Sequence, residues 1–410
     1  MSGIFTGALK IVQPPVNHGL PRLSLSLPGN IDVGLRAFCY LPESLLMANV
    51  APHTSAQIAI LRPICIFFMM YVHVNPGFDP AAHSGAMLYF GTLIVDFFGR
   101  VSVSALSLIS GFLIASGAMH KRVVTQIWSR IRVLYVPMLV WSAIFIGLAL
   151  GGSAVLGYAT SASKAFDGLS FAQIVVEKIM FLYGTPISLA LGFLRDLTVS
   201  SVLVILLLRI PGNAAIWAAL AVVLGIVLFG HMEPIVYRST ILLFMLAGVA
   251  FYRVQGDLHI PRAIVLSAAF LFLALVVDEI LGLSGTASSA RSTLELSAFN
   301  VAKRSILTVL VLTLGGLLVT TRVGNWLRGI GDDVYLSFLC HTTVISIFWV
   351  AWSRLVGNEF HWAYPVFFLL SPALVMMLAT VVGPLLSALP HPIQIGLRGK
   401  ARDARSVGSN

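Results

Sequence analysis

The sequence predicts an all-α, polytopic integral membrane protein: a single bundle of about ten transmembrane helices. Hydrophobic residues make up 58% of the 410-residue chain and charged residues only 10%, whereas a water-soluble domain carries about 25% charged residues. The mean hydropathy is +0.93. Long apolar runs recur along the chain, and in lipid such runs must be helical because the backbone has no water to bond.

Ten apolar runs are long enough to be considered as spans. They cover about residues 57–74, 92–117, 134–152, 187–208, 214–230, 239–253, 263–283, 304–320, 334–351 and 365–388. A polytopic protein of this length normally forms one bundle, so we expect one membrane domain at 57–388. Residues 1–56 would then form an N-terminal extension, expected to be loosely ordered, and residues 389–410 a basic cytoplasmic tail.

Lys and Arg in the connections predict the orientation. If the N-terminus is cytoplasmic, sixteen of the 26 Lys and Arg residues lie in cytoplasmic segments and seven in the segments on the other side. Because cytoplasmic loops carry the excess of Lys and Arg, we expect both termini to face the cytoplasm. The longest outside connection, at about 153–186, is expected to fold over an extracytoplasmic site.

The charge distribution and the cysteines exclude several classes of protein. The formal net charge is +10, but the basic residues do not form a stripe with interleaved aromatics, so no nucleic-acid partner is expected. Cys39, Cys65 and Cys340 stand apart, without a CxxC pair or the spacing of metal ligands. We therefore expect neither a disulfide framework nor a metal site.

The first span contains RPICIFFMMYVH, which places Arg62 and His73 in one apolar stretch. An ionisable side chain at membrane depth costs at least ~2.5 kcal/mol on insertion scales and indicates a functional role. Eleven helical residues turn through about 1100°, three turns plus ~20°, and rise ~16 Å, so both side chains are expected on one face at two depths. The alternative is structural: Arg62 snorkels to the interface, and His73 is an interfacial histidine bonded to a carbonyl.

The second span carries a charged pair and a patch of small residues. Asp96 and Arg100 are four residues apart, so we expect them to pair on one helix face in a structural role. Ser107, Ser110 and Gly111 would allow another helix, or a ligand, to approach closely.

Basic residues cluster before the third span, in HKRVVTQIWSRIRVLYVP. A basic juxtamembrane loop is most often only the positive-inside signal. The functional alternative is that Arg130 and Arg132 bind the phosphates of a cytoplasmic cofactor, because guanidinium groups suit bidentate phosphate recognition.

Three further polar residues lie inside later spans. Arg195 and Asp196, in GFLRDLTVSSVL, are adjacent, so their side chains point about 100° apart on a helix and are expected to have separate partners. His341, in DDVYLSFLCHTTV, lies about two turns into the ninth span. A lone buried histidine is more often a packed, hydrogen-bonded residue than a catalytic one, and both interpretations of His341 stay open.

Five of these stretches, taken together, resemble the bacterial membrane-bound acyltransferase-3 family. They are the arginine, ten residues and histidine from Arg62 to His73, the Ser-Gly-Phe-Leu-Ile run at 110–114, the basic stretch and proline at 130–137, Phe-Leu-Arg-Asp-Leu at 193–197 and Tyr-Leu-Ser-Phe-Leu-Cys-His at 335–341. They follow the family's order over roughly residues 57–388. The FLRDL segment and the overall size most resemble the subgroup of sugar O-acetyltransferases, which includes the fucose 4-O-acetylases of nodulation signals.

The resemblance implies an O-acyltransferase of the bacterial cytoplasmic (inner) membrane, in contact with membrane lipid. Its donor would be acetyl-CoA or another acyl-CoA, and its acceptor a sugar hydroxyl on an envelope glycan or a secreted lipo-oligosaccharide such as a nodulation signal. A sugar hydroxyl needs a base within hydrogen-bond reach, for which His73 is the candidate. Arg62 would hold the donor's carbonyl or phosphopantetheine, and Arg130 and Arg132 its nucleotide phosphates.

One departure from the family pattern concerns the two arginines of the basic stretch. The family typically has them three residues apart, whereas Arg130 and Arg132 are two apart. Side chains two apart on a helix diverge by about 200°, so both would face one cofactor only if the segment is unwound.

Other functions remain open at this point. An exporter or flippase of a glycan or glycolipid would use Arg62, His73, Arg195 and Asp196 as a substrate or proton path. A degenerate family member would bind lipid or glycan without turnover. Within the acyltransferase reading, His73 would act either as a base or as a covalent acyl carrier.

Overall fold

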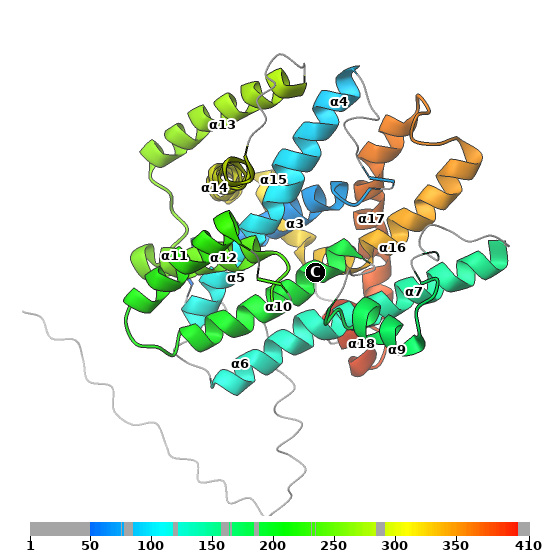
Figure 1. The fold of residues 1–410 in the computed structure, drawn as a ribbon, viewed down its shortest axis with the longest axis horizontal. Coiled ribbons are helices and arrows are strands. Elements are labelled where there is room, and N and C mark those ends of the chain that lie inside the picture. Colours follow the sequence, from blue (N-terminus) through cyan, green and yellow to red (C-terminus); the bar gives the residue numbers. More distant parts are fainter. Residues whose placement is uncertain are drawn as a thin grey trace, which may run out of the picture. The chain divides into compact units, whose positions relative to one another are not determined.

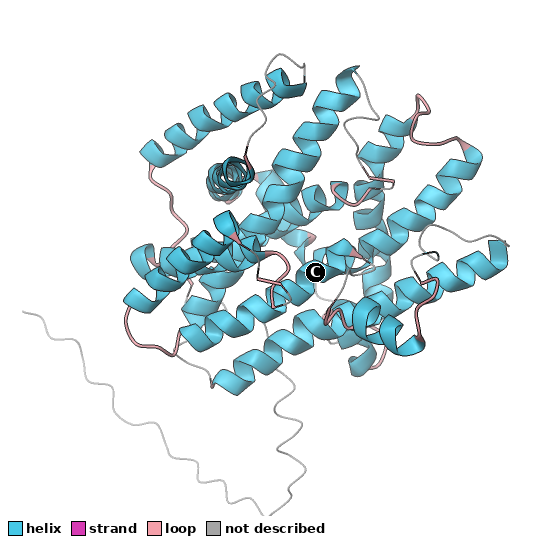
Figure 2. Ribbon diagram, in the orientation of Figure 1, coloured by secondary structure: helices cyan, strands magenta, loops and turns pink. Residues whose placement is uncertain are grey.

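The computed structural model of the chain describes residues 50–74, 76–77, 85–117, 122–156, 164, 166–183, 188–230, 232–233, 235–283 and 292–400. Within these ranges the regular structure is helical, without a strand (Figure 2). Residues 1–49, which make up most of the expected extension, and the last ten residues of the expected tail lie outside the described ranges.

The helices pack together into one bundle and cross one another at different angles (Figure 1). In chain order they are α3 (Pro52–Tyr71), α4 (Gly85–Thr92), the π-helical η2 (Leu93–Gly99), α5 (Arg100–Gly117), α6 (Val123–Arg130), the π-helical η4 (Ile131–Tyr135), α7 (Val136–Leu156), α9 (Phe171–Gln173), the π-helical η5 (Ile174–Ile179), α10 (Leu189–Leu207), α11 (Ala214–Phe229), α12 (Ser239–Gln255), α13 (Arg262–Leu283), α14 (Thr293–Leu318), α15 (Arg322–Gly329), α16 (Gly331–Leu355), α17 (Tyr364–Leu386) and α18 (His391–Arg398).

The membrane-spanning character of the fold is confirmed. Eight of the described helical segments have the length and apolar composition needed to cross a bilayer. Two more apolar helices, α11 and α12, are shorter, with 16 and 17 residues. Each of the ten expected spans therefore corresponds to an apolar helix.

Two expected span boundaries are wrong in ways that matter for the site. The first helix runs over Pro52–Tyr71 rather than 57–74, so His73 lies in the turn that follows it. The eighth begins at Thr293 rather than 304, because Ser292 and Glu295 form a capping box that satisfies the first free N–H groups. As a result, Arg304 lies inside a helix instead of in a connection.

Helix α3 occupies the middle of the bundle, with α5 on one side and α16 and α17 on the other (Figure 1). Among the described helices, α5 and α12 make the most extensive contact with each other. A Cβ added at Gly111 would overlap the Met245 carbonyl, and one added at Gly248 would overlap the Leu108 carbonyl. The expected close approach at the small-residue patch is thus confirmed, and what approaches is a helix. Small residues allow such contacts between helices in lipid.

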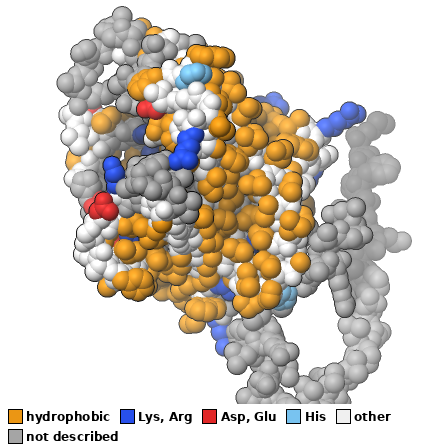
Figure 3. All heavy atoms as spheres, turned by 90° about the vertical axis from the view of Figure 1, so that its right-hand side faces the viewer, with side chains coloured by type: hydrophobic (Ala, Val, Ile, Leu, Met, Phe, Trp, Pro, Cys, Tyr) orange, Lys and Arg blue, Asp and Glu red, His pale blue; other side chains and the backbone are white. Residues whose placement is uncertain are grey.

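The outward faces of the helices are apolar. Helix α13 is almost entirely unburied along its hydrophobic window, and Leu266 and Phe270 on it are 71% and 74% exposed. Figure 3 shows another face, where hydrophobic side chains cover most of the described surface. Such a surface is compatible with lipid and not with water.

Helix α18 packs against α7 and α16. Arg398, at its end, is buried and donates to the Asp333 carboxylate at 2.8 Å and to the Ser387 hydroxyl at 2.7 Å. Gly399 then ends the helix with φ = 71°, a left-handed conformation that glycine adopts without strain. Residues 391–398, expected to belong to a tail, therefore form a helix that is part of the bundle.

Candidate functional site

His73 lies two residues beyond the end of α3, in a turn closed by its own N–H to the Met70 carbonyl at 3.0 Å. Its side chain is partly exposed. Removal from water lowers the pKa of His73 well below its ordinary value, and electrostatic coupling to the His341 ring and to the positive Arg238 guanidinium lowers it further. The imidazole is therefore neutral at physiological pH, with a lone pair available to accept a proton.

The second histidine, His341 of α16, meets the first across the bundle. The two ring centres are 5.3 Å apart, although the residues are 268 positions apart in the sequence. His341 is fully buried. Its Nδ1 lies 2.5 Å from the Phe338 carbonyl, so Nδ1 carries the proton and Nε2 is left as an acceptor. No described residue bonds that Nε2. The structure thus places two neutral imidazoles side by side.

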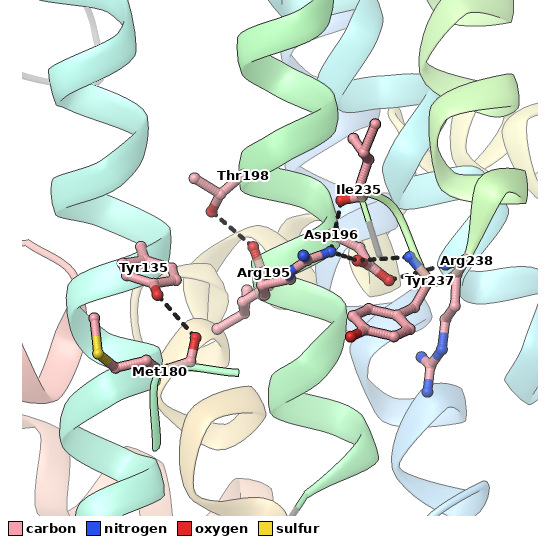
Figure 4. Close-up of polar contacts among 9 residues, drawn as sticks. Tyr135, Met180, Arg195, Asp196, Thr198, Ile235, Tyr237 and Arg238 are labelled. Carbon is pink, nitrogen blue, oxygen red and sulfur yellow. Dashed lines mark hydrogen bonds and ion pairs between the residues drawn. The ribbon is translucent and has the colours of Figure 1, made fainter. Parts of the chain in front are cut away.

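Arg195 and Asp196 bond to each other, which corrects the expectation of separate partners. The Arg195 Nη1 donates to Asp196 Oδ1 at 2.9 Å and to the Ile235 carbonyl at 2.7 Å (Figure 4). Asp196 also accepts the backbone N–H groups of Tyr237 and Arg238, at 3.2 and 3.1 Å. Adjacent side chains can pair in this way because the long guanidinium arm bends back to the carboxylate of the next residue.

The pair therefore acts as a clamp on the segment 235–238, which precedes α12. The Tyr237 ring lies 4.8 Å from the Arg195 guanidinium carbon, and Phe181 stacks on Tyr237 at 5.1 Å. Phe181 adopts φ = 52°, a strained conformation that these contacts offset. The expected outside connection thus reaches this segment through Phe181. Because the clamp fixes the backbone of Arg238, it also fixes a charge that acts on His73.

The second span contributes a charged pair, Asp96 and Arg100, that lies near Arg238. Asp96 lies in the π-helical turn η2, and Arg100 bonds its carboxylate at 2.8 Å, as expected from their spacing. Arg100 lies within electrostatic range of Arg238. Ser110, by contrast, donates to the Leu106 carbonyl of its own helix at 2.8 Å, so its hydroxyl is already engaged.

Comparison with known proteins decides the family. The sequence profile described as "Acyltransferase domain", of the acyltransferase-3 family, matches residues 55–386. The chain belongs to this acyltransferase family. The match includes all five stretches on which the resemblance rested, and with the apolar helices it shows that the protein is a membrane acyltransferase.

A curated relative of the acyltransferase is similar over nearly its whole length. The chain is 25% identical over 375 residues to the succinoglycan biosynthesis protein ExoH of Rhizobium meliloti (strain 1021), covering 87% of the chain and 95% of ExoH. No solved structure is significantly similar to the chain.

The other expected site residues of the acyltransferase lie apart from the two histidines. Arg62 sits nine residues before the end of α3, about 14 Å along the helix axis. Arg130 ends α6, and Arg132 lies in the wider π-helical turn η4, so the basic segment stays helical and is not unwound. All three side chains are partly exposed.

Two site residues were not predicted from the sequence: Arg238 lies between two expected spans, and Arg304 lies at the edge of another. Arg238 is the residue before α12, and Arg304 lies eleven residues after the start of α14 at Thr293. The signal for Arg304 was present, since the capping-box pattern of Ser292 and Glu295 moves the helix start upstream. No comparable signal exists for Arg238, because its position depends on the distant clamp.

Proposed function

We propose that the acyltransferase moves an acyl group from a cytoplasmic acyl-CoA to a sugar hydroxyl of a cell-envelope polysaccharide or secreted lipo-oligosaccharide. The observation that carries the proposal is the pair of neutral histidines, His73 and His341, at 5.3 Å inside a membrane acyltransferase. A polysaccharide acceptor is supported by the similarity to a protein of succinoglycan biosynthesis.

His73 acts as the general base in this mechanism. The sugar oxygen attacks the thioester carbonyl carbon while His73 takes the hydroxyl proton. The carbon–sulfur bond then breaks, and the departing thiolate of CoA receives that proton, so the products are the sugar ester and free CoA. A positioned base typically contributes 10²–10⁴-fold to the rate.

His341 supplies a second acceptor beside the base. Its unbonded Nε2 would accept a hydrogen bond from a neighbouring hydroxyl of the acceptor sugar. A sugar with two adjacent hydroxyls would then donate one to each imidazole, which orients the reacting oxygen.

The donor would enter from the cytoplasmic side. Arg130 and Arg132 are suited to nucleotide phosphates because guanidinium groups make bidentate contacts with them. Arg62, lower on the helix that leads to His73, would hold the pantetheine arm or the thioester carbonyl. We assign the protein to the bacterial inner membrane with both termini cytoplasmic, and the first donor to test is acetyl-CoA.

The experiment is mass spectrometry of surface glycans and secreted lipo-oligosaccharides, including nodulation signals where the host makes them. A host lacking the protein is complemented with wild type, His73→Ala or the control His53→Ala at matched membrane abundance. His53 is an exposed histidine in the first turn of α3, the helix that His73 follows.

The proposal expects an acyl mass increment with wild type and His53→Ala that is absent with His73→Ala. The increment also identifies the acyl group and the acceptor sugar. An increment that persists in His73→Ala would remove His73 from the mechanism. Unchanged glycan mass with altered glycan export would instead support the transport function.

A further inference from the structure

Three arginines from separate parts of the chain lie within electrostatic range of one another. Arg100 begins α5, Arg238 precedes α12, and Arg304 lies within α14. Arg304 Nη1 is 3.4 Å from the hydroxyl of Thr240, two residues after Arg238 in the chain. Arg304 lies within electrostatic range of both Arg100 and Arg238, and Arg238 acts on His73.

The nearby carboxylates offset these charges only in part: Asp196 acts on Arg238 and Asp96 on Arg304 from a distance, but each is bonded to other groups. The Asp96 carboxylate is bonded to Arg100, and Asp196 is bonded to Arg195 and to two backbone N–H groups. Within the described part of the chain, the Arg238 guanidinium donates to the Leu189 carbonyl, at 3.1 Å. Among the described residues, neither Arg238 nor Arg304 has a carboxylate at ion-pair distance.

Buried guanidinium groups without a neighbouring anion raise the free energy of the folded protein unless a bound anion neutralises them. Cations at membrane depth normally pair with an anion, yet here guanidinium groups repel one another. Desolvation lowers the pKa of Arg238; the charge of Asp196 opposes this effect and that of Arg100 reinforces it. Both Arg238 and Arg304 remain partly exposed, so a ligand can reach them.

We propose that Arg238 and Arg304 bind the carboxylate of an acidic substrate group held beside His73. The inference rests on the proposed function and adds to it the charge of a substrate. The carboxylate would belong either to the free end of a dicarboxylic acyl group or to an acidic sugar of the acceptor. Guanidinium groups suit a carboxylate because they bond both of its oxygens at once.

The test uses membranes that contain the full-length chain. Acetyl-CoA and succinyl-CoA serve as neutral and acidic donors, and glycan from a host lacking the protein serves as acceptor, either native or with its carboxyl groups reduced. Wild type is compared with Arg238→Gln, Arg304→Gln and Arg304→Lys. The control is Arg253→Gln, an exposed arginine near the opposite end of the same helix, α12.

The proposal expects wild type to favour succinyl-CoA over acetyl-CoA, or native over reduced glycan, in kcat/KM. The Gln variants should lose about ten- to a hundred-fold of that ratio, the range for a lost charged hydrogen bond. Arg304→Lys should lose less, and Arg253→Gln nothing. If the Gln variants change the ratio between the two donors, the acyl group carries the carboxylate. If they change the ratio between native and reduced glycan, the acceptor sugar carries it.

A binding measurement that does not depend on acyl transfer tests the same site in case a variant loses activity because it folds poorly. Sodium succinate should raise the melting temperature of the purified wild-type chain more than neutral succinamide does, and Arg304→Lys should reduce that difference.

Three outcomes would overturn the proposal. A wild type that uses neutral and acidic substrates equally, with His73 still required, would reject the carboxylate site and leave the proposed function intact. Equal losses with both donors would mean that the arginines hold a part common to both. No acyl transfer with any donor would reject the proposed function and this inference with it.

Discussion

At the scale of single residues, the chemistry depends on keeping His73 unprotonated. Removal from water, coupling to the His341 ring and the positive charge of Arg238 lower its pKa. Because a base works only when neutral, kcat/KM should rise with pH through the pKa of His73 in the folded protein and be level above it. That rise should therefore lie below the pH at which an ordinary histidine titrates.

The first prediction concerns the removal of the positive charge of Arg238. Arg238→Gln should raise the pKa of His73, because protonation then meets less repulsion, and should shift the acidic limb of the kcat/KM profile to higher pH. The measurement is acyl transfer as a function of pH, with Arg253→Gln as the matched control. An acidic limb at the same pH in both variants would contradict the electrostatic role of Arg238.

The second prediction concerns the unbonded Nε2 of His341. His341→Ala should raise KM for the acceptor and lower kcat by less than His73→Ala does, because it removes an orienting hydrogen bond and not the base. His341→Gln, which can offer an amide oxygen near the same place, should recover part of the loss. Steady-state kinetics with varied acceptor distinguish this from simple misfolding, which would lower the activity of both variants without a specific change in KM.

The sequence predicted several of these residues and missed others for a physical reason. His73 was found because an ionisable group in an apolar stretch is expensive. Arg195 and Asp196 were found in the same way, but their direct bond was not, since helical geometry alone gives only the direction of Cβ. Arg238 was missed because its place beside His73 depends on the clamp made by Asp196, a contact across 42 residues.

At the scale of helices, the contact between α5 and α12 supports the site. Gly111 and Gly248 let the two backbones touch, and this contact fixes α12, whose first turn follows Arg238. Helix existence was predictable from hydropathy, because a spanning helix needs a long apolar run. Helix ends were less predictable, because α14 starts at a capping box that a hydropathy profile does not detect.

The third prediction tests this contact with paired substitutions. In Gly248→Ala the added methyl group would overlap the Leu108 carbonyl, whereas in Gly225→Ala on α11 it would meet open space. We expect Gly248→Ala to lower stability by about 1–3 kcal/mol and Gly225→Ala to leave it equal or slightly higher. Loss of the folded-protein peak in size-exclusion chromatography after heating measures both. Equal melting temperatures would show that the two helices can separate without penalty.

At the scale of the whole molecule, the outer surface is apolar and suits lipid, whereas the histidines and charged residues of the site lie together inside the bundle. Hydropathy predicted this division, and a family resemblance on five short stretches predicted the family. The arrangement of the polar group could not be predicted, because it joins side chains from α5, α10, α12, α14 and α16 with the turn after α3. Packing between distant helices, which no local pattern encodes, decides which of these meet.

The fourth prediction concerns orientation in the membrane. In a chain whose three cysteines are replaced, Asn213→Cys lies between α10 and α11, and Asn358→Cys lies between α16 and α17. With both termini cytoplasmic, a membrane-impermeant maleimide should label Asn358→Cys in intact cells and Asn213→Cys only after permeabilisation. The reverse pattern would invert the orientation and put the donor arginines on the wrong side.

The measurement that tests the central claim most directly is transfer of labelled acyl groups from acyl-CoA to glycan by the purified full-length chain, with free CoA counted alongside. The account predicts equal amounts of glycan ester and free CoA from wild type and His53→Ala, and a rate lowered by at least about 10²-fold in His73→Ala. Transfer by His73→Ala at the wild-type rate would contradict it.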